Sequence, residues 1–233
     1  MNKLLQYILD YAEVWALFIP MGVLLFNRQQ PKFMKPVIIY LWLALLLDVC
    51  IDTIMTYNDM NLGPLISNNY LYNLHSMMRF ICFSYFFLLL DLSFYQKILR
   101  VLPFISVLFV VINFGFVKGE NLFDFGKLSG NLLTAEAYLL LIGCIIYYLA
   151  RLKEEVPVMS GGKGFWVITG ISFYVVINFF VFLFYDAAFQ LYKQTKDQLV
   201  NYMWNFHNIA YIILCIFLAK AFYVQNSVRY RHA

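Results

Sequence analysis

Seven long apolar segments, separated by short polar stretches, run through the 233-residue chain. A helix needs about 20 mainly apolar residues to cross the hydrocarbon core of a membrane, and each segment is near that length. The pattern predicts spans near residues 5–26, 37–57, 70–95, 101–117, 133–151, 165–186 and 201–224. We therefore expect an all-α fold, an integral membrane seven-helix bundle in which residues 1–233 form a single transmembrane domain.

The first segment is the least apolar around its middle, because Asp10 and Glu13 interrupt it. A count of six spans would place this segment on the membrane surface. The segment also lacks the small-x-small cleavage site of a signal peptide, so we expect it to remain as the first helix. Seven spans is the count that the pattern favours.

Composition supports a membrane protein. Hydrophobic residues make up 63% of the chain and charged residues 13%, whereas a soluble domain is about 45–50% apolar and about 25% charged. A soluble chain of this composition would expose large apolar patches to water, which lipid would otherwise cover. No basic stripe lies outside the flanks of the segments, so nucleic-acid binding is not expected.

Basic residues predict the orientation, because cytoplasmic loops carry an excess of Lys and Arg. With the N-terminus outside, the cytoplasmic segments hold 11 basic residues and the outer segments 5. The cytoplasmic residues are Arg28, Lys32, Lys35, Lys97, Arg100, Arg151, Lys153, Lys163, Lys220, Arg229 and Arg231. The outer residues are Lys3, Lys118, Lys127, Lys193 and Lys196. We expect the N-terminus outside, the C-terminus in the cytoplasm and the lipid bilayer as partner, in the plasma (inner) membrane of a bacterium.

Two pairs of ionisable residues lie inside the predicted spans. Asp48 and Asp52 are four residues apart and so share one helix face, as do His75 and Arg79. Counted from Tyr57 and Tyr70 as outer edges, Asp52 matches His75 and Asp48 matches Arg79, at about 8 Å and about 14 Å of depth. The sequence therefore predicts an Asp52–His75 pair and an Asp48–Arg79 pair.

Further polar residues are predicted in the same outer half, and the inner half is drier. They are Glu136, Asn178, Asn205, His207 and Asn208. Ionisable groups inside a membrane usually face the bundle interior or a wet cavity. Together with Asp48, Asp52, His75 and Arg79, these residues are interpreted as an outward-facing ligand pocket. The alternative is a buried polar network that only fixes helix packing.

A seven-helix sensor or receptor-like protein fits this pocket best, and the sequence favours this function over an enzyme without excluding one. The residues after Val224 are too few for an effector domain, so the signal would pass to a separate cytoplasmic signalling protein. That partner would dock on the basic loops and on the tail around Arg229 and Arg231. No cofactor is expected. The sequence does not decide whether the protein forms a homo-oligomer.

Two other functions compete. An intramembrane metal-dependent hydrolase would take zinc ligands from His75, His207, Asp48 and Asp52, but Arg79 beside them would repel the metal. A proton- or ion-coupled transporter would use the same carboxylates and histidines as a relay, although no inverted repeat is visible. A retinal protein is disfavoured because Lys220 is close to the cytoplasmic end of its span. The cysteines Cys50, Cys82, Cys144 and Cys215 are expected to be buried apolar side chains.

Overall fold

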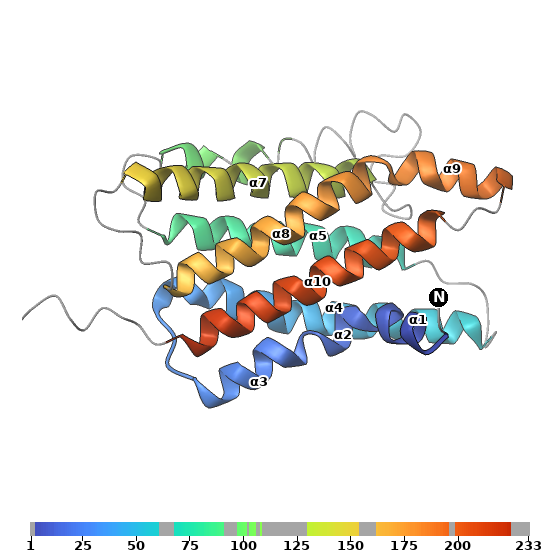
Figure 1. The fold of residues 1–233 in the computed structure, drawn as a ribbon, viewed down its shortest axis with the longest axis horizontal. Helices are drawn as coiled ribbons and strands as arrows, with labels where there is room; N and C mark the ends of the chain where they lie inside the picture. Colours follow the sequence, from blue (N-terminus) through green and yellow to red (C-terminus); the bar gives the residue numbers. More distant parts are fainter. Residues whose placement is uncertain are drawn as a thin grey trace, which may run out of the picture.

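The structure is a computed structural model, and it describes residues 3–60, 68–90, 97–101, 103–105, 108, 130–153, 162–195 and 199–224. In these residues every regular element is helical, and the all-α prediction is confirmed. The elements, shown in Figure 1, are α1 (Lys3–Asp10), α2 (Ala12–Trp15), α3 (Phe18–Phe26), η1 (Lys32–Met34), α4 (Lys35–Asp59), α5 (Asn69–Leu88), α7 (Gly130–Lys153), α8 (Lys163–Leu183), α9 (Tyr185–Thr195) and α10 (Leu199–Tyr223).

Four of the described helices are long and apolar enough to cross a membrane. They are η1 with α4 over Lys32–Asn58, and α7, α8 and α10. Helix α5 has 20 residues but is more polar, because it carries Asn73, His75 and Arg79. The predicted span 101–117 falls mostly outside the described residues, as do residues 91–95 of the predicted span 70–95.

The first predicted segment is not one continuous helix. It breaks at Tyr11 and again at Ala16–Leu17, which divides it into α1, α2 and α3. Pro20 accounts for the second break, since a proline has no N–H to donate to the carbonyl four residues earlier and its ring crowds that carbonyl. Ile19 instead donates to the Ala16 carbonyl at 3.1 Å, a tighter turn than an α-helix makes.

Helix α9 is a second departure from the prediction. The predicted span 165–186 ends at Leu183 in the structure, and α9 begins after a turn at Phe184. Phe189, Leu191 and Tyr192 on α9 are exposed, while Ala188 is buried.

The long helices run along one axis, with α4 and α8 pointing one way and α5, α7 and α10 pointing the other (Figure 1). Helix α4 packs on α5, α5 on α7, α7 on α8 and α8 on α10; α10 packs on α1, α2 and α3, and α2 returns to α4. The described helices thus close into a ring. Helices α8 and α10 approach each other closely at Gly170, where an added Cβ would lie 2.7 Å from Phe217 Cβ.

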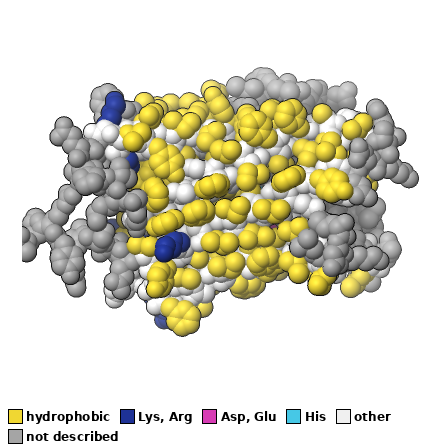
Figure 2. All heavy atoms as spheres, viewed as in Figure 1, with side chains coloured by type: hydrophobic (Ala, Val, Ile, Leu, Met, Phe, Trp, Pro, Cys, Tyr) yellow, Lys and Arg dark blue, Asp and Glu magenta, His cyan; other side chains and the backbone are white. Residues whose placement is uncertain are grey.

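The surface of the ring is apolar. Large hydrophobic side chains are exposed on every long helix, including Trp42, Tyr85, Leu149, Phe180 and Phe206, and Figure 2 shows hydrophobic side chains over most of the face in view. Among the described residues, the buried polar side chains point into the interior of the ring instead. This arrangement, apolar outside and polar inside, is the one expected of helices surrounded by lipid.

Basic residues gather at one end of the ring, which we call the basic end. Helices α4 and α8 begin there with Lys35 and Lys163, and α7 ends there with Arg151 and Lys153. The end of α10, with Lys220 in its last turn, lies at the same end (Figure 1).

Three of the four cysteines, Cys82, Cys144 and Cys215, are buried as expected, and the prediction for Cys50 is wrong. Cys50 is two residues after the buried Asp48. Since successive residues are about 100° apart around a helix, Cys50 points to the opposite face of α4, away from the bundle.

Candidate functional site

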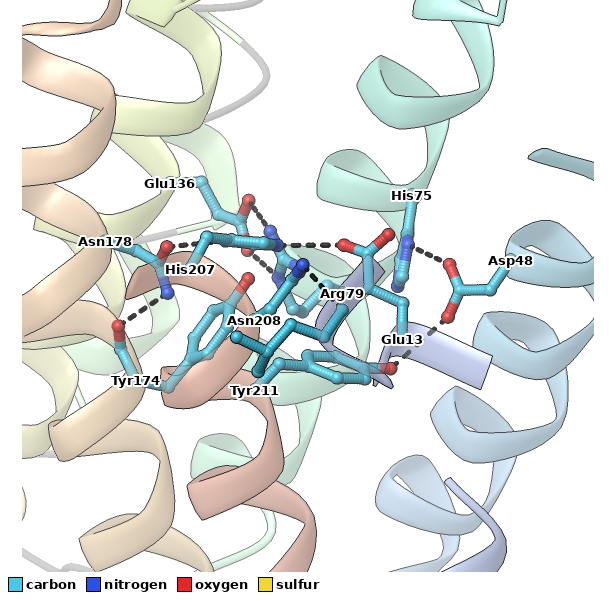
Figure 3. A network of polar contacts seen from close by, with 11 residues as sticks. Glu13, Asp48, His75, Arg79, Glu136, Tyr174, Asn178, His207, Asn208 and Tyr211 are labelled. Atoms are coloured by element: carbon cyan, nitrogen blue, oxygen red, sulfur yellow. Dashed lines mark hydrogen bonds and ion pairs between the residues drawn. The ribbon is translucent and has the colours of Figure 1, made fainter. Parts of the chain in front are cut away.

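A connected set of polar side chains fills the middle of the ring and extends toward the end opposite the basic end. Every helical wall contributes to it, as Figure 3 shows. The members are Glu13 from α2, Asp48 from α4, His75, Ser76 and Arg79 from α5, Glu136 from α7, Asn178 from α8, and His207, Asn208 and Tyr211 from α10. We call this set the polar network.

Arg79 and Glu136 form its strongest contact. Arg79 Nε donates to Glu136 Oε1 at 2.5 Å, and Arg79 Nη2 donates to Oε2 at 2.8 Å. The Ser76 hydroxyl also donates to Glu136 Oε2. On the other side, the guanidinium carbon of Arg79 lies 4.8 Å from the centre of the Tyr174 ring. Both partners are buried, so the two charges compensate each other away from water.

His207 joins α10 to α8 and α2 through both ring nitrogens. Its Nδ1 lies 2.6 Å from Asn178 Oδ1, and its Nε2 lies 2.9 Å from Glu13 Oε1. Because Asn178 Nδ2 donates to the Tyr174 carbonyl at 2.8 Å, its oxygen is the acceptor that faces His207. His207 Nδ1 must therefore carry a hydrogen.

This assignment has a consequence for Glu13. With Nδ1 protonated, His207 Nε2 either accepts a hydrogen from a neutral Glu13 or donates one to a carboxylate. In both cases one proton lies between Nε2 and Oε1.

Asp48 and His75 form the third contact. His75 Nδ1 lies 3.0 Å from Asp48 Oδ1, and the Tyr211 hydroxyl donates to Asp48 Oδ2 at 3.4 Å. The ring of Tyr40 lies 6.0 Å from that of His75, between centroids. Asp48 is thereby held from α5 and α10 together.

The predicted pairings are therefore wrong. Asp48 meets His75 instead of Arg79, and Arg79 meets Glu136 on α7. The cause is an axial offset between neighbouring helices. Asp48 is 11 residues before the end of α4 at Asp59, whereas His75 is 6 residues after the start of α5 at Asn69. The prediction places Tyr57 and Tyr70 at equal depth, but the actual partners differ from that register by one helical turn.

Asn205 and Asn208 connect α10 to α1. Asn205 exchanges side-chain hydrogen bonds with Gln6 at 3.2 and 3.3 Å, and Asn208 Nδ2 donates to the Leu9 carbonyl at 2.9 Å. The Leu9 carbonyl is close to the break at Tyr11 between α1 and α2. These amides thus hold the short helices that bring Glu13 into the ring.

The polar network leaves little free space among the described residues. It encloses a cavity of about 10 Å³ lined by Glu13, His75, Arg79 and His207, with Tyr72, Leu133, Phe182 and Trp204 completing its wall. A cavity of this size holds about one water molecule. His75 Nε2 is buried and has no hydrogen-bond partner among the described residues, so it is the group such a water would serve.

Asp52 lies outside the polar network. It is only half-buried and lines a separate groove with Val14, Val49 and Met60. The other eight predicted site residues are all buried in the ring interior: Asp48, His75, Arg79, Glu136, Asn178, Asn205, His207 and Asn208.

The zinc ligand set considered from the sequence is not assembled. His75 and His207 belong to different pairs, and Asp52 is in the groove. Across the described ranges, no group of three or more His, Cys, Asp or Glu residues is arranged to hold a metal ion.

Sequence reasoning left several members out of the site. Glu13 had a usable signal, because a carboxylate inside an apolar segment needs a partner there. Ser76 had a weaker one, since it is three residues before Arg79 and so shares its helix face. Tyr211 had a similar one, since it is four residues after His207 and so shares its helix face.

No protein-family model, curated protein sequence or solved structure matches this chain.

Proposed function

We propose that this chain is a seven-span membrane sensor of the receptor-like type. In this proposal the N-terminus is outside, the C-terminus is in the cytoplasm of a bacterium, and the protein lies in its plasma (inner) membrane. A stimulus at the outer end changes helix packing, and a separate cytoplasmic protein reads the change. The observation that carries the proposal is that one polar network takes side chains from every described helical wall.

The polar network supports switching because its contacts are few, buried and electrically coupled. Glu13, Asp48 and Glu136 bring three acidic groups, and Arg79 brings one permanent positive charge. The histidines therefore decide how well the interior is neutralised. Breaking a buried pair is costly, so intermediate packings are disfavoured and a stimulus would shift the population between discrete ones.

The basic end supplies a route to a cytoplasmic reader. Lys163 Nζ donates to the carbonyls of Ala221 and Phe222 at 3.3 and 3.2 Å, and Asn27 Nδ2 reaches the Phe222 carbonyl at 3.4 Å. The last turn of α10 is thereby tied to the start of α8 and to the residues after α3. A movement of α10 that begins at His207 would reach this turn and the tail beyond it.

A proton-coupled transporter is the second candidate. It is favoured by the proton held between His207 and Glu13, since such pairs act as relays in transporters. A pH-sensitive dye inside proteoliposomes separates the two functions. Proton flux that Glu13→Gln abolishes would support transport, and its absence would favour sensing.

The sensor is tested by in-cell photo-crosslinking at the basic end. A photoreactive amino acid at Leu152, which is 77% exposed at the end of α7, should capture a cytoplasmic protein. The same group at Ile145, on the lipid-facing side of α7, is the matched control. Capture at Leu152 that changes with Glu136→Gln supports the proposal. Equal capture at both positions, or none that responds to the variant, would contradict it.

A further inference from the structure

A groove on the outside of the ring, between α2 and α4, holds Asp52, the one predicted site residue that is not buried in the ring interior. Its volume is about 480 Å³. Val14 from α2 faces Val49 and Asp52 from α4, and Tyr57 and Met60 line the outer part. No partner for the Asp52 carboxylate is found in the described part of the chain.

Apart from the Tyr57 hydroxyl, the polar side-chain atoms of this groove are acceptors. Thr53 Oγ1 donates its hydrogen to the Val49 carbonyl at 2.6 Å, and Thr56 Oγ1 donates its hydrogen to the Asp52 carbonyl at 2.9 Å. Both hydroxyl hydrogens are therefore used within α4, and only oxygen lone pairs remain for a ligand. With the Asp52 carboxylate, they complement a group that donates hydrogen bonds and carries positive charge.

The depth of Asp52 restricts the ligand further. Asp52 is five residues, or about 8 Å, from the midpoint of the 25-residue helix α4 at Leu47. The hydrocarbon core extends about 15 Å on each side of its midplane. With α4 centred in the bilayer, the carboxylate lies below the level of the lipid phosphates, where a lone charge is costly.

A phospholipid headgroup does not fit this site well. It would bring a phosphate together with its ammonium group, and none of the described residues that line the groove is basic. An amine attached directly to an apolar chain has no such phosphate. Its chain would lie against Val14, Val49 and Met60, and the Tyr57 ring would offer an additional cation–π contact.

We infer that this groove binds an amphiphilic primary amine, with the ammonium group on Asp52 and the Thr53 and Thr56 oxygens and the alkyl chain on the apolar wall. The inference rests on the proposed sensor and names the class of its ligand. Asp52 is one turn from Asp48, and Val14 is next to Glu13. A ligand held between α2 and α4 would therefore change the separation of the two helices that carry Glu13 and Asp48 into the polar network.

The test is binding of 12,12,12-trifluorododecylamine to the full-length protein in phosphatidylcholine nanodiscs, followed by ¹⁹F NMR. Asp52→Asn should weaken binding at least about tenfold, as expected for loss of a charge-assisted hydrogen bond. Asp10→Asn is the matched control. It removes the same charge from α1, where Asp10 accepts from Gln6 outside the groove, and should leave binding unchanged. Val49→Trp should fill the groove and reduce binding without changing any charge.

Competition identifies the chemistry of the ligand. Dodecylamine should displace the probe, dodecyltrimethylammonium should do so less well because it cannot donate hydrogen bonds, and dodecanoate should not displace it. Binding that is equal in Asp52→Asn and in the unsubstituted protein, or displacement by phosphatidylethanolamine added to the nanodisc, would overturn the inference. Asp52-dependent binding that leaves crosslinking at Leu152 unchanged would keep the site and count against the sensor.

Discussion

Arg79 on α5 and Glu136 on α7 are joined by two parallel hydrogen bonds between a guanidinium and a carboxylate, both buried. The geometry is specific, because the planar guanidinium offers donors in a fixed fork that matches the two carboxylate oxygens. Lysine could supply the charge but not the fork. The pair therefore sets both the spacing and the axial register of these two helices.

Glu136→Gln should lower the free energy of unfolding by about 3–5 kcal/mol, because it leaves the buried Arg79 charge without compensation. Reversible unfolding in mixed detergent micelles measures this. The double variant Arg79→Met with Glu136→Leu should lose less than the single variant, since an apolar pair of similar size requires no charge compensation. A cost below about 1 kcal/mol for Glu136→Gln would show that the pair is not isolated from water.

His207 should carry a hydrogen on Nδ1 in every protonation state, because Asn178 presents an acceptor to it. The ¹⁵N NMR shifts of the imidazole nitrogens report this directly, with His207→Asn as the assignment control. Asn178→Leu should lower the free energy of unfolding by about 1–3 kcal/mol, because it leaves that buried donor unsatisfied. A His207 tautomer with a bare Nδ1 would contradict the geometry of this part of the polar network.

Gly170→Ala should destabilise the fold by about 1–3 kcal/mol, since its new Cβ would lie 2.7 Å from Phe217 Cβ and force α8 and α10 apart. Gly22→Ala in α3 is the matched control, because no atom lies within 4 Å of the added Cβ. Its expected effect is no loss, or a gain of up to about 1 kcal/mol from higher helix propensity. Equal effects of the two substitutions in the same unfolding assay would argue against close packing at Gly170.

The long apolar helices could be predicted from the sequence because a membrane span is a property of length and local composition. The predicted span 133–151 corresponds to Gly130–Lys153, and 201–224 corresponds to Leu199–Tyr223. The break at Ala16–Leu17 follows from Pro20 and so had a signal in the sequence. The break at Tyr11 and the presence of α9 depend on local turns and on packing against α10, which apolar periodicity does not report.

The membership of the polar network was easier to predict than its pairings. An ionisable residue in an apolar segment must be directed inward, so Asp48, His75 and Arg79 could be assigned to the interior from the sequence alone. Which of them meet depends on the offset between helices. A shift of four residues moves a side chain by about 6 Å along the axis and exchanges one partner for the next. Asp52 shows the same limit, because it shares a helix face with Asp48 and yet lines the groove between α2 and α4.

The central claim, that the polar network controls the packing of the basic end, is tested most directly by pulsed electron paramagnetic resonance. The two spin labels replace the exposed side chains of Phe26, at the end of α3, and Leu152, at the end of α7. The substitution Cys50→Ala removes the exposed native cysteine, which would otherwise also be labelled. In folded protein in nanodiscs, Glu136→Gln should add a second, distinct distance between the labels. A single unchanged distance, with only a lower unfolding free energy, would contradict the claim and leave the polar network with a packing role alone.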